Sequence, residues 1–110
     1  MNSKVERYTY RVMWSEEDGE YVGLCAEFPS LSHLDESSDG AWNGIHRLAA
    51  DVFEEMVGAG QQPPEPIATK RYSGEFMARV SPDLHRRLAL EAAEAGESMN
   101  KIVIEKLARQ

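Results

Sequence analysis

Three side chains of contrasting chemistry alternate in the run GEFMARV: Glu75, Met77 and Arg79. The arginine fork matches the O6 and N7 acceptors of guanine, a methionine can contact a thymine methyl group, and a glutamate can accept from cytosine N4. Because phosphates repel a carboxylate, we expect Arg79 to dominate any reading of DNA bases. An arginine on an exposed strand is also compatible with a merely solvated charge, so the surrounding elements must decide.

The elements around these residues read as strand, helix, turn and helix. The alternation predicts a strand over residues 75–80, with Phe76, Ala78 and Val80 facing a core. Ser81-Pro82 starts a helix, Gly96 ends it, and Ser98 starts another. A lone strand leaves backbone groups unpaired, whereas pairing with a second copy about a two-fold axis gives an antiparallel ribbon that fits the major groove. The predicted helical core consists of Leu84, Leu88, Ile102 and Leu107.

The run GEFMARVSPDLHRRLALEAAEAGESMNKIVIEKLAR, residues 74–109, resembles a ribbon-helix-helix domain of the Arc and MetJ type. The resemblance implies that the outward strand residues Glu75, Met77 and Arg79 contact bases. It also implies that the free N–H groups at the start of the second helix clamp a DNA phosphate. The phosphate-contacting positions are then Ser98, Met99 and Asn100, with Lys70 and Arg71 adding contacts before the strand.

Charge divides the chain into two parts. Residues 1–66 carry four basic and thirteen acidic residues, a net charge of −9, whereas residues 67–110 carry eight basic and six acidic residues, a net charge of +2. The glycine- and proline-rich stretch at residues 58–66 cannot continue a helix and predicts a linker. We therefore expect two domains, residues 1–66 and residues 67–110, of which the acidic one suits a basic protein and the other suits DNA.

The first part predicts a β-β-β-α unit. Residues 5–14 and 20–28 read as two strands of a hairpin around the turn Glu16-Glu17-Asp18-Gly19, and residues 32–35 as a weaker third strand. Ser37 or Ser38 can cap a helix. The apolar face of that helix is predicted from spacings of three and four, and consists of Ile45, Leu48, Ala49, Val52 and Met56.

The run YTYRVMWSEEDGEYVGLCAEFPSLS, the amphipathic helix and the G-x-G-x-x-P-P stretch are together similar to HicB antitoxins. The resemblance implies an α+β protein: a degraded RNase-H-like β-β-β-α domain, then a ribbon-helix-helix (β-α-α) dimerisation domain. It implies a small basic HicA-like ribonuclease toxin as partner, operator DNA as a second partner, and repression of the chain's own operon. The chain would form a homodimer, with pairing into a tetramer left open. The predicted toxin contacts are Glu16, Glu17, Asp18 and Glu20.

No catalytic or metal site is predicted, and no cofactor. The first strand has no acid at its centre, and Asp51 and Glu55 share a helix face that normally points to solvent. The histidines His33, His46 and His85 lack metal-ligand spacing. A single cysteine, Cys25, excludes an intramolecular disulfide and is expected in the core. These residues together lead us to expect that the protein is not an enzyme. No apolar run is long enough for a membrane span, so we also expect a cytoplasmic protein.

Two alternatives remain open. The chain is also compatible with a freestanding ribbon-helix-helix regulator whose first domain binds a ligand or a protein. It is further compatible with an interaction module whose C-terminal part only dimerises. A toxin gene beside this one separates the first alternative from the antitoxin hypothesis, and DNA binding separates the second.

Overall fold

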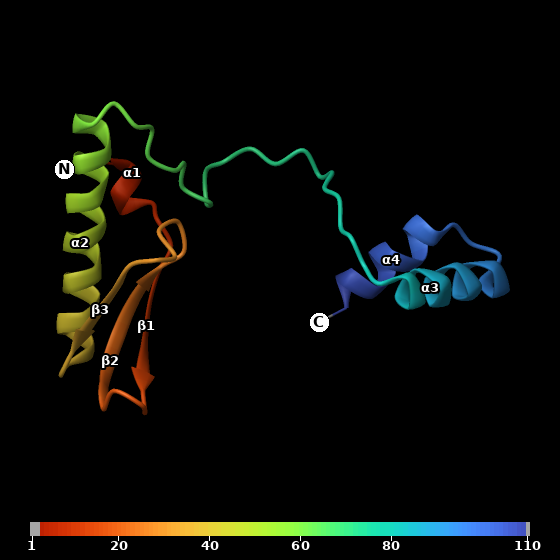
Figure 1. Cartoon of the computed structure of the whole chain (residues 1–110), viewed down its shortest axis with the longest axis horizontal. Coiled ribbons are helices and arrows are strands. Elements are labelled where there is room, and N and C mark those ends of the chain that lie inside the picture. Colours follow the sequence, from red (N-terminus) through yellow and green to blue (C-terminus); the bar gives the residue numbers. More distant parts are fainter. Residues whose placement is uncertain (1–2, 110) are drawn as a thin grey trace. The chain divides into compact units, whose positions relative to one another are not determined.

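In the computed structural model, residues 3–109 are described, and the chain divides into two compact units, Met1–Tyr72 and Ser73–Gln110 (Figure 1). We refer to them as the N-terminal and C-terminal units. The class is α+β, as predicted, because a three-stranded antiparallel sheet is combined with several helices. The division falls between Tyr72 and Ser73, six residues beyond the predicted boundary at residue 66.

The N-terminal unit contains a short helix, a three-stranded sheet in the order β1-β2-β3 and a long helix along one face of that sheet (Figure 1). Its elements are α1 (Ser3–Glu6), β1 (Tyr10–Ser15), β2 (Glu20–Cys25), β3 (Ser32–Asp35) and α2 (Ser38–Gly58). The predicted third strand and long helix are confirmed. The Ser37 side chain caps α2 by accepting from the backbone N–H of Gly40 at 2.9 Å.

The predicted first strand was too long at its start. Residues 3–6 form a helical turn, and strand pairing begins only at Tyr10. The reason is that Val5 and Tyr8, three residues apart, both point into the core, which a strand cannot arrange on one face. The second strand likewise ends at Cys25, because a turn in which Phe28 N–H donates to the Cys25 carbonyl carries Phe28 into the core.

The core of the N-terminal unit lies between α1, the sheet and α2. Ile45 and Ala49 of α2 are fully buried and pack with Cys25, which confirms the predicted helix face and the predicted core cysteine. The helix approaches β2 closely at Gly23, where a Cβ would collide with the Ala41 carbonyl and the Ile45 side chain. Gly23 therefore allows α2 to pack closely against β2.

The C-terminal unit contains α3 (Pro82–Ala95) and α4 (Met99–Ala108), joined by a tight turn. Ser81 caps α3 by accepting from Leu84 N–H, and Gly96 ends it in the left-handed conformation, as predicted. Ala92 and Ile102 are the buried apolar side chains of this unit. The predicted strand over residues 75–80 is not formed, because this extended segment has no neighbouring strand in the single chain.

Candidate DNA-binding and partner-binding surfaces

The predicted base-reading residues lie on the extended segment before α3. Glu75, Met77 and Arg79 are all exposed, with 83% of the Met77 surface accessible. A bend supports the start of the segment, where the Glu75 N–H donates to the Ser73 hydroxyl at 3.1 Å. The side chains are therefore available to a ligand, although a strand that would align them is not formed in one chain.

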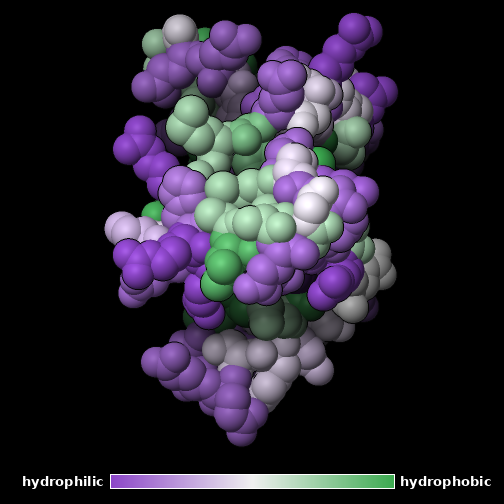
Figure 2. Space-filling view, turned by 90° about the vertical axis from the view of Figure 1, so that its right-hand side faces the viewer, coloured by the Kyte–Doolittle hydropathy of each residue, from purple (hydrophilic) through white to green (hydrophobic). Residues whose placement is uncertain are grey.

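An apolar groove lies between this segment and the two helices. It has a volume of about 900 Å³ and is lined by all three alternate residues predicted to face a core, Phe76, Ala78 and Val80. Two of the predicted base-reading residues, Glu75 and Arg79, also line it, so the segment does not divide its side chains between two faces in one chain. Phe76 is 81% exposed and Leu107, predicted as core, is 66% exposed. Figure 2 shows apolar surface between charged side chains on the side of this unit that faces the viewer. The C-terminal unit thus leaves much of its apolar surface in solvent.

The start of α4 offers the predicted phosphate-binding groups. Ser98 caps the helix, and its hydroxyl oxygen accepts from Lys101 N–H at 3.0 Å. Met99 and Asn100 are the first residues of the helix, where backbone N–H groups lack helical acceptors. The capping role of Ser98 leaves its hydroxyl proton and the helix N-terminus for an anion.

The other two predicted phosphate contacts lie in the N-terminal unit. Lys70 and Arg71 are both exposed, and the Lys70 ammonium lies 5.9 Å from the centroid of the Tyr72 ring. A Pro66 turn fixes their backbone, since Lys70 N–H donates to the Pro66 carbonyl at 2.9 Å. They are thus attached to a different unit from the predicted base-reading residues.

The predicted toxin contacts lie on the hairpin turn between β1 and β2. Glu16, Glu17 and Asp18 are exposed, and Glu20 begins β2. The Asp18 carboxylate accepts from the Ser15 hydroxyl at 2.8 Å, which closes the turn. The remaining carboxylates of this turn are free to meet a cationic partner, except that Glu16 accepts from the Trp14 indole N–H at 2.5 Å.

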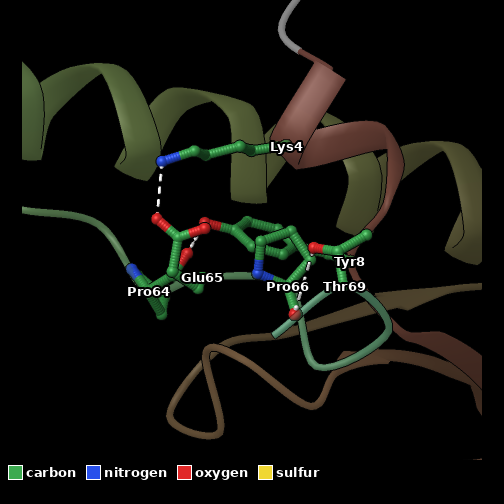
Figure 3. Close-up of polar contacts among 6 residues, drawn as sticks. All are labelled: Lys4, Tyr8, Pro64, Glu65, Pro66 and Thr69. Atoms are coloured by element: carbon green, nitrogen blue, oxygen red, sulfur yellow. Dashed lines mark hydrogen bonds and ion pairs between the residues drawn. The ribbon is translucent and has the colours of Figure 1, made fainter. Parts of the chain in front are cut away.

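A segment of the predicted linker is docked on the N-terminal unit (Figure 3). We call residues 63–70 the docked segment. The Tyr8 hydroxyl donates to the Pro64 carbonyl at 2.8 Å, and Lys4 pairs with Glu65 at 2.7 Å. Pro66 is among the most buried side chains, so this part of the chain belongs to the N-terminal unit rather than to a free linker.

Glu27 holds the end of the docked segment. Its carboxylate accepts from Thr9 N–H at 2.8 Å and from Ile67 N–H at 2.9 Å. Burial raises the pKa of this carboxyl, but those hydrogen bonds outweigh burial, and the pKa lies below its ordinary value. Burial, followed by the nearby charges of Cys25 and Glu27, raises the pKa of the Tyr8 hydroxyl to about 12. No motif in the sequence marks these roles, and the only signal for them is the proline cluster at residues 63–66.

Aromatic side chains gather beside β1. The Tyr10 and His46 rings stack with centroids 3.5 Å apart, and Trp42 lies 4.6 Å from His46. His46 Nδ1 lies 2.8 Å from the Trp42 carbonyl, which fixes the ring. Asp51 and Glu55 are exposed. Within residues 3–109, no three histidine, cysteine or carboxylate side chains gather as a metal site requires, and no helix could cross a membrane.

The comparison with protein families gives one match. The sequence model of the HicB family matches residues 60–107, which cover the docked segment, the extended segment and both C-terminal helices. No curated protein and no solved structure matches the chain. Over these residues, a little under half of the chain, the sequence is similar to the HicB family, which supports the predicted resemblance. The family suggests a toxin–antitoxin context.

Proposed function

We propose that this chain is the antitoxin of a type II toxin–antitoxin system, and that it has no catalytic activity of its own. Its N-terminal unit binds and neutralises a small basic HicA-like ribonuclease. Its C-terminal unit dimerises as a ribbon-helix-helix and represses the operon that encodes both proteins. The observation that carries the proposal is the apolar groove of the C-terminal unit, which a single chain leaves open.

Dimerisation would fill this groove. Phe76 and Leu107 are mostly exposed, and Val80 is about half exposed at 48%. Isolated apolar residues on a surface are ordinary, but a groove lined by many of them is typical of an interface. Residues 75–80 are extended and lack a partner strand, so a second copy of the segment would satisfy their backbone groups while its helices cover the groove. Both requirements are met by one two-fold contact.

DNA binding would follow from the paired segments. Alternate side chains of a strand point to opposite faces, so burying Phe76 and Val80 would turn Met77 and Arg79 outward. A two-stranded ribbon of this kind fits the major groove, where Arg79 can bind guanine bidentately. The capped N-terminus of α4 would then receive a phosphate, with Ser98 and Asn100 beside it.

Toxin binding would use the acidic N-terminal unit. Residues 1–66 carry a net charge of −9, so this part would attract a basic ribonuclease and repel nucleic acid. A partner that binds RNA needs a cationic surface, and covering that surface with a carboxylate-rich domain would block the RNA. The family match supports this context independently of the charge.

A mobility-shift experiment with DNA from upstream of the chain's own gene tests the repressor function. We expect Arg79→Ala to weaken binding by about 1–3 kcal/mol and to relax specificity at one base pair. The matched control is Arg86→Ala, which removes the same charge from an exposed position on α3. Both titrations are run at the same stated salt concentration, because phosphate contacts make affinity steeply salt-dependent. Equal binding by both variants and the wild type would contradict base reading by Arg79.

Co-expression tests the antitoxin function. The adjacent small basic reading frame is expressed under an inducible promoter, with and without this chain, and cell growth is followed. We expect the neighbouring protein alone to arrest growth, and we expect growth to recover when this chain is expressed with it. Arg79→Ala should still rescue growth, since it changes the DNA-binding surface and leaves the N-terminal unit intact. Failure of the wild type to rescue or to form a complex excludes the antitoxin function.

A further inference from the structure

The sheet of the N-terminal unit has one face that no described element covers. Gly23 points toward α2, and residues directly opposite each other on antiparallel strands share a face. Val12 and His33, which lie opposite Gly23, are therefore on the helix side. Their neighbours along the strands point the other way.

That uncovered face has an apolar centre. Met13, Val22 and Leu34 form a continuous row across all three strands, because Met13 is opposite Val22 and Val22 is opposite Leu34. Leu24 lies on the same face, two residues along β2. Met13 is 46% exposed and Leu34 is 44% exposed. We call these four residues the open-face patch.

The open-face patch has a pocket at one end and acids at the other. Leu24 and Arg11 line a pocket of about 320 Å³ toward the start of β1. At the opposite end lies the acidic hairpin turn, where Glu20, opposite Ser15, shares the face of Val22 and Leu24. Residues 12–46 contain no lysine or arginine. The acidic residues at this end are Glu16, Glu17, Asp18 and Glu20.

We propose that the open-face patch is the surface on which the basic partner docks, a conclusion that rests on the antitoxin function proposed above. An interface combines an apolar centre with a charged rim, and this face has both. At the hairpin-turn end the rim is anionic, so it complements a cationic protein and steers its approach. A second copy of the chain is a poor occupant, because the same face would bring two acidic rims together. Nucleic acid is excluded for the same reason.

The test measures binding of the full-length chain to the small basic protein encoded beside it, in a catalytically inactive form. The test variant is Leu34→Arg, which removes an apolar contact and places a cation against a cationic partner. We expect the dissociation constant to rise about 30-fold or more, the effect of losing an interface hot spot. The matched control is Val57→Arg, at an exposed position near the end of α2, which should leave the constant within about twofold of the wild type.

Three further measurements separate docking from misfolding. Leu34 and Val57 are both exposed, so the melting curves of the two arginine variants should match that of the wild type. Met13→Ala is a milder change on the same face and should also weaken binding of the partner, by less than Leu34→Arg. Added salt should slow association of the wild type. If the wild type binds and Leu34→Arg binds equally well, the docking surface is wrong while the antitoxin function stands. If Leu34→Arg instead abolishes a tetramer without changing partner affinity, a second copy occupies the face and the proposal is also wrong. If the wild type does not bind, the antitoxin function itself fails.

Discussion

The two units of this chain differ in where they place their apolar side chains. The N-terminal unit buries Ile45, Phe53 and Cys25 between a sheet and two helices of one chain. The C-terminal unit, from the segment before α3 onward, has only Ala92 and Ile102 buried among its described residues, and leaves Phe76 and Leu107 in solvent. The first can be stable alone, whereas the second is expected to depend on association. Concentration dependence of stability should therefore distinguish them.

The largest expected effect is in the core of the N-terminal unit. Ile45 is fully buried beneath the sheet, so Ile45→Ala should lower the free energy of unfolding by about 2–5 kcal/mol. Both tryptophans, Trp14 and Trp42, lie in this unit, so denaturation followed by tryptophan fluorescence reports it alone. The loss should be the same at all protein concentrations. Val57→Ala, at an exposed position of the same helix, serves as the control and should change little.

The next effect is in the C-terminal unit and should depend on concentration. Leu107 lines the apolar groove and is mostly exposed in one chain. If a second copy covers it, Leu107→Ala removes about 1.5–3 kcal/mol of dimer stability per protomer. Sedimentation equilibrium measures the shift toward monomer, and helical circular dichroism should show a melting temperature that falls on dilution. If the wild-type chain stays monomeric, the C-terminal unit does not depend on association, and the proposed difference between the two units is wrong.

The same contrast explains how much of the fold was predictable from the sequence. Helix caps are local, and Ser37, Ser81, Ser98 and Gly96 all occupy the positions that their residue types predict. The apolar face of α2 was predictable because its spacing is regular. Local signals therefore sufficed wherever one element determines its own ends.

Interactions between distant segments were not predictable. Val5 and Tyr8 read as parts of an alternating run, which predicts a first strand that begins too early, and only the folded core shows that both side chains face inward. The docked segment depends on Glu27, which lies 40 residues before Ile67 and carries no motif. The open-face patch depends on strand register. The segment at residues 75–80 forms no strand in one chain, and the pairing proposed for it involves a second copy, as does a test of the base-reading role of Arg79.

A smaller and paired effect comes from two glycines with left-handed backbones. Gly19 in the hairpin turn has φ 65° and Gly96 after α3 has φ 66°, and nothing lies within 4 Å of a Cβ at either position. Substitution by alanine therefore costs only local backbone strain, about 1 kcal/mol at each site. Gly19→Ala should shift the fluorescence transition at every concentration, whereas Gly96→Ala should shift only the concentration-dependent one. Equal shifts of both transitions by either variant would mean that the units unfold together.

The smallest effect tests whether the docked segment adds to the stability of the N-terminal unit. Tyr8→Phe keeps the buried ring and removes only the hydrogen bond to the Pro64 carbonyl, so the free energy of unfolding should fall by about 0.5–1.5 kcal/mol. The pH dependence of the free energy of unfolding provides an independent test of this hydrogen bond. The pKa of Tyr8 is raised from 10.0 to about 12 in the folded chain, so its contribution is fully present below pH 10 and is lost as the pH rises toward 12. Unfolding is followed by fluorescence from about pH 9, roughly one unit below the ordinary tyrosine pKa of 10.0, up to about pH 12. Over this range Tyr8→Phe should lose less of its free energy of unfolding than the wild type. Parallel pH profiles would show that the proton on Tyr8 does not hold the segment, and Pro66 burial alone would then account for its docking.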